Sequence, residues 1–195
     1  HVDREKKVVT TSSHSFNYDY LILAMGGEPN TFNVPGVDEH AFTMWSWEDA
    51  TKIRRHIKDT VEAAAKEHDD AKRKAMLTAV VSGAGFTGVE LVGELMEWKD
   101  KLAKDNKLDP AEFSLYLVEA APQILGVVTE KEQQKAEKYM LKKGIQIIKG
   151  NGVANVKKDS VELSDGTVIP THTLIWTAGV KANSDAAAYG IEQAR

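Results

Sequence analysis

Three glycines, Gly83, Gly85 and Gly88, stand at the spacing G-x-G-x-x-G between a β-branched run and a segment with helical periodicity. In a strand–turn–helix the first glycine permits a tight turn, the second lets the backbone approach a pyrophosphate, and the third lets the helix pack closely on the strand. Amides at the start of the helix, from Phe86 and Thr87 onward, would donate to the phosphates, helped by the positive end of the helix dipole. The same glycine spacing also occurs in ordinary turns, so the surrounding elements decide between a turn and a dinucleotide-binding loop.

A second candidate ligand-binding residue is Glu119, at the end of the apolar run FSLYLVE. A carboxylate at the end of the next strand can accept both ribose hydroxyls of an adenosine. Glu119 lies farther along the chain than the usual interval of about 20 residues, which fits a longer helix and the polar connector KDNKLDPAE. The carboxylate would repel a 2′-phosphate, and AAPQIL after it offers no Arg or Lys, so the sequence favours NADH over NADPH. The alternative is a solvated glutamate at the end of a strand.

Two further acids follow the glycines. Glu90 comes two residues after the third glycine and is expected on the first turn of the helix, with Glu94 one turn later. An acid near a helix N-terminus complements the dipole, so helix-terminal charge pairing is one interpretation of both residues. A basic run in an earlier segment could contact phosphate, but such a run is more typical of the solvated side of a helix: Arg54, Arg55, His56 and Lys58.

The composition excludes several other functions. The chain has 195 residues, with 29 acidic and 25 basic residues and a formal charge of −4, so no global positive field would gather nucleic acid. No apolar run approaches the roughly 20 residues of a membrane-spanning helix. The chain has no cysteine, which excludes thiolate and disulfide chemistry within it and suits a reducing, cytoplasmic compartment. Its six histidines are scattered, with no HxxxH or HxH spacing, so no metal site is expected.

The elements that must position these residues alternate between strands and helices. From Ser46, a candidate N-cap with Asp49 at the third helical position, apolar residues recur at helical spacing and predict a long helix that ends in KEHDDAKRK. We further predict strands at MLTAVVSG, FSLYLVE and IQIIKG, helices over 86–104 and 130–143, a meander in VANVKKDSVELSDGTVIP, and a last strand, HTLIWTAG, with Trp176 in the core. This order predicts an α/β fold, in which a Rossmann-like parallel sheet has helices on both faces and a small antiparallel β-meander is added.

The two ends of the chain differ from this pattern. KVVTT at 7–11 and YLILA at 20–24 are predicted strands, and the connector EPNTFNVPGVDEH, which has no apolar periodicity, is a candidate boundary. The chain begins without Met in a charged, strand-like segment and stops in AAAYGIEQAR without a closing element. We therefore interpret it as a fragment or an excised domain.

Three stretches, taken in order, resemble a known family: YDYLILAMGGEPN, SGAGFTGVELVGEL and TLIWTAGVKAN. They resemble the flavoprotein oxidoreductases that bind two dinucleotides, and most closely the type II NADH dehydrogenases, which are NADH:quinone oxidoreductases. In that family an NADH-binding domain is inserted into an FAD-binding domain. The resemblance implies a partial FAD-domain segment and connector over 1–40, an NADH-binding Rossmann-like domain over 41–172, and a return segment to the FAD domain over 173–195. The flanking strands would then be remnants of the FAD-binding domain.

The resemblance also assigns cofactor contacts. Ala24, Met25 and Gly26 match a turn that touches FAD, with Met25 where threonine is common. Glu90 would face the gap between nicotinamide and flavin, as the candidate catalytic residue. Besides Glu119, the implied contacts to NADH are Gly83, Gly85, Phe86, Thr87, Gly88, Val153, Ala178 and Gly179.

The implied activity is hydride transfer from NADH to FAD, followed by delivery of two electrons to quinone in a respiratory chain. The longer parent protein would lie peripherally on the cytoplasmic face of the membrane through a part that this chain lacks, and a homodimer is an open alternative. The 195-residue fragment itself is expected to be inactive. The alternatives are an NADH oxidase or ferredoxin-reductase-type flavoprotein, a non-catalytic NAD-binding module, and a structural domain with a vestigial pocket.

Overall fold

The computed structural model describes residues 1–190. The chain divides into two compact units, one made of Asn30–Gly179 and the other of His1–Pro29 together with Val180–Arg195. Among the described residues, no helix is both long and apolar enough to cross a bilayer.

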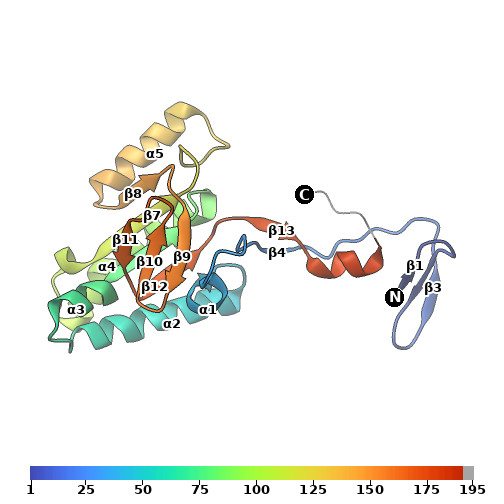
Figure 1. The fold of residues 1–195 in the computed structure, drawn as a ribbon, viewed down its shortest axis with the longest axis horizontal. Coiled ribbons are helices and arrows are strands. Elements are labelled where there is room, and N and C mark those ends of the chain that lie inside the picture. The colour runs from blue at the N-terminus through green and yellow to red at the C-terminus, as the bar shows by residue number, and fades with distance from the viewer. Residues whose placement is uncertain (191–195) are drawn as a thin grey trace. The chain divides into compact units, whose positions relative to one another are not determined.

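The larger unit is built on a five-stranded sheet in the order β5-β12-β6-β7-β8, in which all neighbouring strands are parallel. Figure 1 labels three of these strands, β7, β8 and β12. The strands are β5 (Phe42–Thr43), β6 (Thr78–Ser82), β7 (Ser114–Glu119), β8 (Gln146–Lys149) and β12 (Thr173–Trp176). β6, β7, β8 and β12 confirm predicted strands, whereas the two-residue β5 is too short for its periodicity to be recognised in the sequence.

The helices of this unit connect the strands. They are α1 (Val37–His40), α2 (Trp47–Ala64), α3 (Asp70–Met76), α4 (Phe86–Asn106), the 3-10 helix η1 (Pro110–Glu112) and α5 (Glu130–Lys142). The chain passes from β5 through β6 and β7 to β8 in one direction across the sheet and returns to β12 in the other direction. Since crossovers between parallel strands are right-handed, the forward connections cover one face and the return connection covers the opposite face.

Two hydrophobic cores follow from this topology. One joins the helices to the sheet through residues such as Ile53 of α2, Val92 of α4 and Met140 of α5. The other lies on the opposite face, where Val37 of α1 and the meander residue Val161 pack against the sheet. Neighbouring strand residues alternate between the two cores, which is why the central strands read as continuous apolar runs. The predicted α/β fold class is confirmed. The two faces of the sheet differ in their helices: α2, α4 and α5 pack on one face, and the short α1 packs with the meander on the other.

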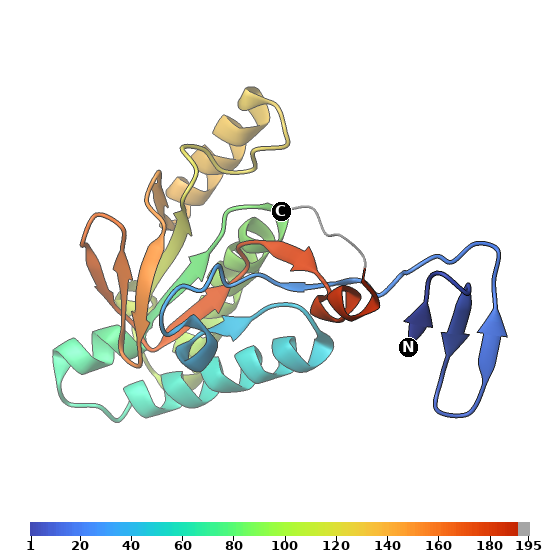
Figure 2. The ribbon, with the colours of Figure 1, turned by 45° about the vertical axis from the view of Figure 1, so that its right-hand side comes forward.

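The meander is a three-stranded antiparallel sheet in the order β11-β10-β9. Its strands are β9 (Val153–Lys157), β10 (Ser160–Leu163) and β11 (Val168–Pro170). Gly166, in the predicted Asp-Gly turn, has a φ of 85°, a left-handed conformation that glycine adopts without strain. The meander is thus confirmed, and Figure 2 shows it beside the central sheet.

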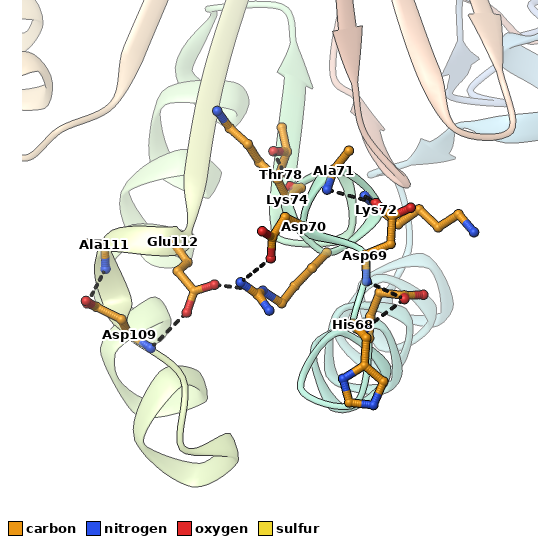
Figure 3. A network of polar contacts seen from close by, with 12 residues as sticks. His68, Asp69, Asp70, Ala71, Lys72, Lys74, Thr78, Asp109, Ala111 and Glu112 are labelled. Carbon is orange, nitrogen blue, oxygen red and sulfur yellow. Dashed lines mark hydrogen bonds and ion pairs between the residues drawn. The ribbon is translucent and has the colours of Figure 1, made fainter.

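The predicted long helix begins as expected but ends early. Ser46 caps α2, with its side chain accepting the Asp49 N–H, and α2 ends at Ala64 rather than in KEHDDAKRK. Asp69 then starts the separate helix α3, because its carboxylate accepts the N–H groups of Ala71 and Lys72 at 3.0 Å each (Figure 3). An aspartate that bonds these two amides is an N-cap, so it interrupts the helix that the charge pattern suggests.

The smaller unit contains two small antiparallel sheets. One is β1 (Val2–Asp3), β2 (Val8–Thr10) and β3 (Ser15–Asn17) in that order, and the other pairs β4 (Gly27–Pro29) with β13 (Val180–Ala182). A 3-10 helix, η2 (Ser184–Tyr189), follows β13. The prediction of a strand at 7–11 is confirmed by β2.

The prediction of a strand over 20–24 is wrong. These residues form no strand, and the side chains of Tyr20 and Ile22 are 93% and 87% exposed. A strand needs a neighbour to bond its N–H and C=O groups, and no strand pairs with this segment among residues 1–190.

Candidate functional site

The glycine loop joins β6 to α4 at the carboxyl edge of the parallel sheet. β6 bonds to β7 on one side and to β12 on the other, and the chain continues from β6 toward β7 while β12 arrives from the return connection. The loop therefore lies where the strand order reverses, which is where ligands bind in open α/β sheets.

Gly83 makes the turn out of β6. Its φ is 101°, and a Cβ there would lie 2.7 Å from Ala178 N. The Gly83 N–H donates to Val118 O of β7 at 2.8 Å. The position therefore needs glycine both for its left-handed conformation and for the close approach of the turn after β12.

Gly88 lets α4 pack against its own loop. A Cβ at Gly88 would lie 1.9 Å from Gly83 O and 2.8 Å from Thr177 Oγ1. No side chain fits at such distances, so the third glycine has the packing role that its spacing predicts.

Gly85 has a different environment, because a Cβ there would meet no atom within 4 Å. It is the N-cap of α4, with φ −73° and ψ −173°, and no side chain caps this helix end. Phe86 and Thr87 are exposed. The start of α4 thus has no side-chain cap, and the space that a side chain at Gly85 would fill is open.

The start of α4 also lacks the acids found on the other long helices. α2 carries Glu48 and Asp49 in its first turn, and the first turn of α5 includes Glu132, whose carboxylate accepts the Thr129 N–H at 3.0 Å. The first turn of α4 contains no acidic residue. Its positive dipole end is therefore available to an anionic ligand such as a phosphate.

Glu119, at the end of β7, is hydrogen-bonded to the glycine loop. Its Oε2 accepts the Ala84 N–H at 2.6 Å and its Oε1 accepts the Ala121 N–H at 2.8 Å. The side chain is partly exposed, and each carboxylate oxygen has a second lone pair for a further donor. The Asn151 N–H donates to Glu119 O at 3.2 Å, so the loop before β9 lies beside this end of β7.

The other candidate residues take up different positions. Val153 is buried in the core under the meander, with 8% of its surface exposed. Glu90 is exposed on α4 and lines a groove of about 560 Å³ between α4 and α5, together with Glu94. The expectation that Glu90 lies on the first turn of the helix is wrong, because the helix begins at Phe86 and its first turn is free of acids.

The turn after β12 is fixed to the loop and to the connector before α1. Thr177 Oγ1 donates to Ser82 O and to Gly83 O at 2.9 Å each. Trp176 is 4% exposed, which confirms it as a core residue, and its Nε1–H donates to Asn30 O at 2.9 Å. Gly179 has a φ of 86°, and a Cβ there would lie 2.6 Å from the ring of Phe32. No local pattern indicates the Thr177 contacts, because they join residues that are 94 and 95 positions apart in the chain.

The predicted flavin turn, Ala24–Gly26, lies in the smaller unit. Gly26 has a φ of 72°, and a Cβ there would meet no atom within 4 Å. The Asn183 side-chain amide donates to Met25 O at 3.4 Å. The turn is thus open on the side of Gly26, and Met25 offers no hydroxyl to a ligand.

Among residues 1–190, no group of three or more His, Cys, Asp or Glu residues is placed so that it could hold a metal ion. His56 instead has a structural role. Its Nε2 lies 3.0 Å from His172 O and 3.0 Å from Thr173 Oγ1, and its ring packs on Phe42 with centroids 4.5 Å apart. Burial disfavours the charged imidazolium and lowers the pKa of His56 below its usual 6.5. His56 is therefore not part of a solvated phosphate-binding face.

Comparison with known proteins agrees with this geometry. The family model described as pyridine nucleotide-disulphide oxidoreductase matches residues 1–195. Two curated relatives named type II NADH:quinone oxidoreductase, from Staphylococcus saprophyticus and Staphylococcus haemolyticus, are 32% and 34% identical over 187 residues, which is 93% of this chain and 46% of each relative. A solved structure of NDH2 from Plasmodium falciparum in complex with NADH superposes with a TM-score of 0.83 at 25% identity, covering 94% of this chain and 40% of that one.

The chain thus spans about half the length of the curated relatives that it matches, or 46%. The family match covers the whole chain and includes the glycine loop, Glu119 and the turn after β12. Together with the parallel sheet and the open N-terminus of α4, this match shows that the chain belongs to the pyridine nucleotide-disulphide oxidoreductase family.

Proposed function

We propose that this chain is the NADH-binding part of an FAD-dependent NADH:quinone oxidoreductase. The observation that carries the proposal is the N-terminus of α4, which has an open glycine as N-cap, no side-chain cap and no acid in its first turn. The names of the relatives and the NADH complex of the Plasmodium falciparum protein favour this activity over the alternatives.

In this proposal the loop binds the pyrophosphate of NADH. The amides of Phe86, Thr87 and Gly88 donate to its oxygens, and the dipole of α4 stabilises the negative charge. The open space over Gly85 is the position in which the phosphates come closest to the backbone. Gly83 and Gly88 act through packing, because each holds the loop against a neighbouring segment.

Glu119 binds the adenosine ribose. Its two backbone bonds hold the carboxylate in place while the remaining lone pairs accept the ribose hydroxyls. A 2′-phosphate would be repelled by the carboxylate, so we propose that the chain selects NADH over NADPH. The loop before β9, with Val153 behind it, forms the neighbouring wall of this adenosine site.

When bound, FAD supplies the two-electron acceptor for the hydride of NADH. The chain's own residues bind and orient: Ala178 and Gly179 border the nicotinamide end, Ala24–Gly26 contribute one turn toward the flavin, and Glu90 acts at the reacting ring. The described residues offer the flavin no helix N-terminus beside Ala24–Gly26. We therefore propose that the chain binds NADH and does not retain FAD.

For the longer protein we propose quinone as the final electron acceptor and a peripheral position on the cytoplasmic face of a membrane. We also propose that residues 41–172 form its NADH-binding domain, between segments of the FAD-binding domain. The curated names support the quinone. A homodimer is a further proposal for that protein, and sedimentation of the longer protein with and without detergent tests it.

Titration of the 195-residue chain with NADH tests the binding proposal. We expect saturable binding by calorimetry, a colourless purified protein, and no steady NADH oxidation with a soluble quinone. Absence of binding at millimolar NADH would contradict the proposal and favour a scaffold with a vestigial pocket. A yellow protein with steady turnover would contradict the assignment of the flavin site to a longer chain.

A further inference from the structure

The hydroxyl of Thr177 bonds the end of β6 and the first glycine of the loop, and it lies beside the third glycine. Its Oγ1 lies 2.9 Å from Ser82 O and 2.9 Å from Gly83 O. A Cβ at Gly88 would lie only 2.8 Å from the same Oγ1. The end of β6, the turn and the first turn of α4 therefore all meet at one side chain of the segment that follows β12.

The bond from Thr177 to Gly83 O depends on the side-chain hydroxyl. The Thr177 backbone N–H already donates to Ser82 O at 2.8 Å, so the backbone alone joins the two strands. The side chain adds the bond to Gly83 O, the first residue of the turn. Because a hydroxyl has one proton, it is shared between the two carbonyls or alternates between them, and in either case it holds both oxygens toward one point.

Thr177 is itself held from the other side. The preceding Trp176 bonds Asn30 O through its indole N–H at 2.9 Å, and the Asn30 N–H bonds Gly179 O at 3.2 Å. Residues 176–179 therefore cannot easily follow a displaced loop. A rigid donor next to a glycine-rich turn restricts conformations that the glycines would otherwise allow.

We propose that Thr177 is a positioning residue for dinucleotide binding, which fixes the turn at Gly83 so that the first amides of α4 point to the pyrophosphate. This inference rests on the proposed function, since it concerns the same loop. Thr177 acts through the loop and does not contact the ligand.

The variants Thr177→Val and Thr177→Ser test this role. Valine keeps the shape but removes the hydroxyl, whereas serine keeps it. The matched control is Thr171→Val, because Thr171 Oγ1 donates to Thr78 O at 2.6 Å at the opposite end of β6. This control thus removes a buried hydroxyl that bonds the same strand, at the end of the strand opposite to the glycine loop.

Calorimetry with NADH and with adenosine separates positioning from general stability. We expect Thr177→Val to weaken NADH binding about tenfold, as the loss of one partly buried hydrogen bond allows. Adenosine binding should change little, because adenosine lacks the pyrophosphate. Thr177→Ser should restore the affinity, and Thr171→Val should lower the unfolding free energy without changing NADH affinity. Equal NADH affinity of folded Thr177→Val and the unmodified chain would overturn the inference, as would an equal loss for both ligands.

Hydrogen exchange of the ligand-free chain provides a readout that does not depend on the proposed function. The amide of Gly83, bonded to Val118 O, should exchange faster in Thr177→Val than in Thr177→Ser. Unchanged exchange there would contradict positioning by Thr177 even if the chain binds no NADH. If Thr177→Val does not fold, Thr177→Ala, which leaves space for a water, takes its place in both measurements.

Discussion

The carboxylate of Glu119 accepts the Ala84 N–H at 2.6 Å and so joins the end of β7 to the glycine loop after β6. The residue expected to bind ribose and the loop expected to bind pyrophosphate are therefore one hydrogen-bonded unit. The other oxygen of the same carboxylate accepts the Ala121 N–H at 2.8 Å. Replacing Glu119 must accordingly affect the loop as well as the selectivity between nucleotides.

Glu119→Gln tests both effects. We expect NADH affinity to fall by about tenfold to a hundredfold, because hydrogen bonds to a charged acceptor contribute roughly 1.5–3 kcal/mol. NADPH affinity should fall less, because the repulsion of the 2′-phosphate is removed, and Glu119→Arg should narrow the preference further or reverse it. Calorimetry with both nucleotides measures this, with Glu94→Gln as the control on α4. Equal affinity of the unmodified chain for NADH and NADPH would refute the role of Glu119.

Gly85→Val should abolish NADH binding and leave the fold intact. A side chain there meets no protein atom within 4 Å, and the φ of −73° is accessible to valine, so the valine occupies only the space over the helix start. The control is Gly93→Ala, since Gly93 lies within α4 and a Cβ there would likewise meet no atom within 4 Å. Circular dichroism checks folding. A folded Gly85→Val chain with unchanged NADH affinity would contradict the assignment of the phosphate-binding loop.

Gly88→Ala should have the opposite outcome and destabilise the fold itself. Its Cβ would lie 1.9 Å from Gly83 O, so the start of α4 must move away from the loop. We expect a loss of at least 1–3 kcal/mol in the free energy of unfolding, as for other overpacked sites, measured by denaturant titration. A chain with unchanged stability would mean that the loop and the helix are not packed as described.

The order and type of the central elements follow from local sequence patterns. The capping pair Ser46–Asp49, the Asp-Gly turn at Gly166 and the buried apolar strands each act over a few residues, and each has the predicted conformation. The prediction of a strand over 20–24 is wrong because this segment has no partner strand among the described residues, whereas the other predicted strands have one. An apolar run becomes a strand only beside a partner, and the run itself does not show whether a partner is present.

The candidate site is predictable only in part. The glycine spacing indicates the loop, and the open Cβ direction at Gly85 and the crowded one at Gly88 agree with the roles that the spacing predicts. The bond from Glu119 to Ala84 spans 35 residues. The contacts of Thr177 depend on the return of β12 beside β6, which no local pattern specifies. Tertiary contacts of this kind require the structure.

The pH dependence of stability should carry a contribution from His56. Burial lowers its pKa in the folded chain below the usual 6.5, so the unfolded chain binds the proton more readily. The stability that neutral His56 contributes is therefore complete above about pH 6.5, the usual value, and is lost as the pH falls from there through the lower pKa of the folded chain. Since the ring is only partly buried, the contribution is smaller than for a fully buried histidine.

His56→Gln isolates this contribution, because glutamine keeps a side-chain N–H for the His172 carbonyl but does not titrate. We expect the free energy of unfolding of the unmodified chain to decrease more steeply between pH 7 and pH 5 than that of His56→Gln, measured by urea titration at several pH values. His68→Gln is the matched control, since His68 is exposed just before α3, and it should retain the slope of the unmodified chain. Parallel pH profiles of His56→Gln and the unmodified chain would show that His56 has the same proton affinity in the folded and unfolded chains. That result would contradict a pKa lowered by burial of the ring between Phe42 and the start of β12.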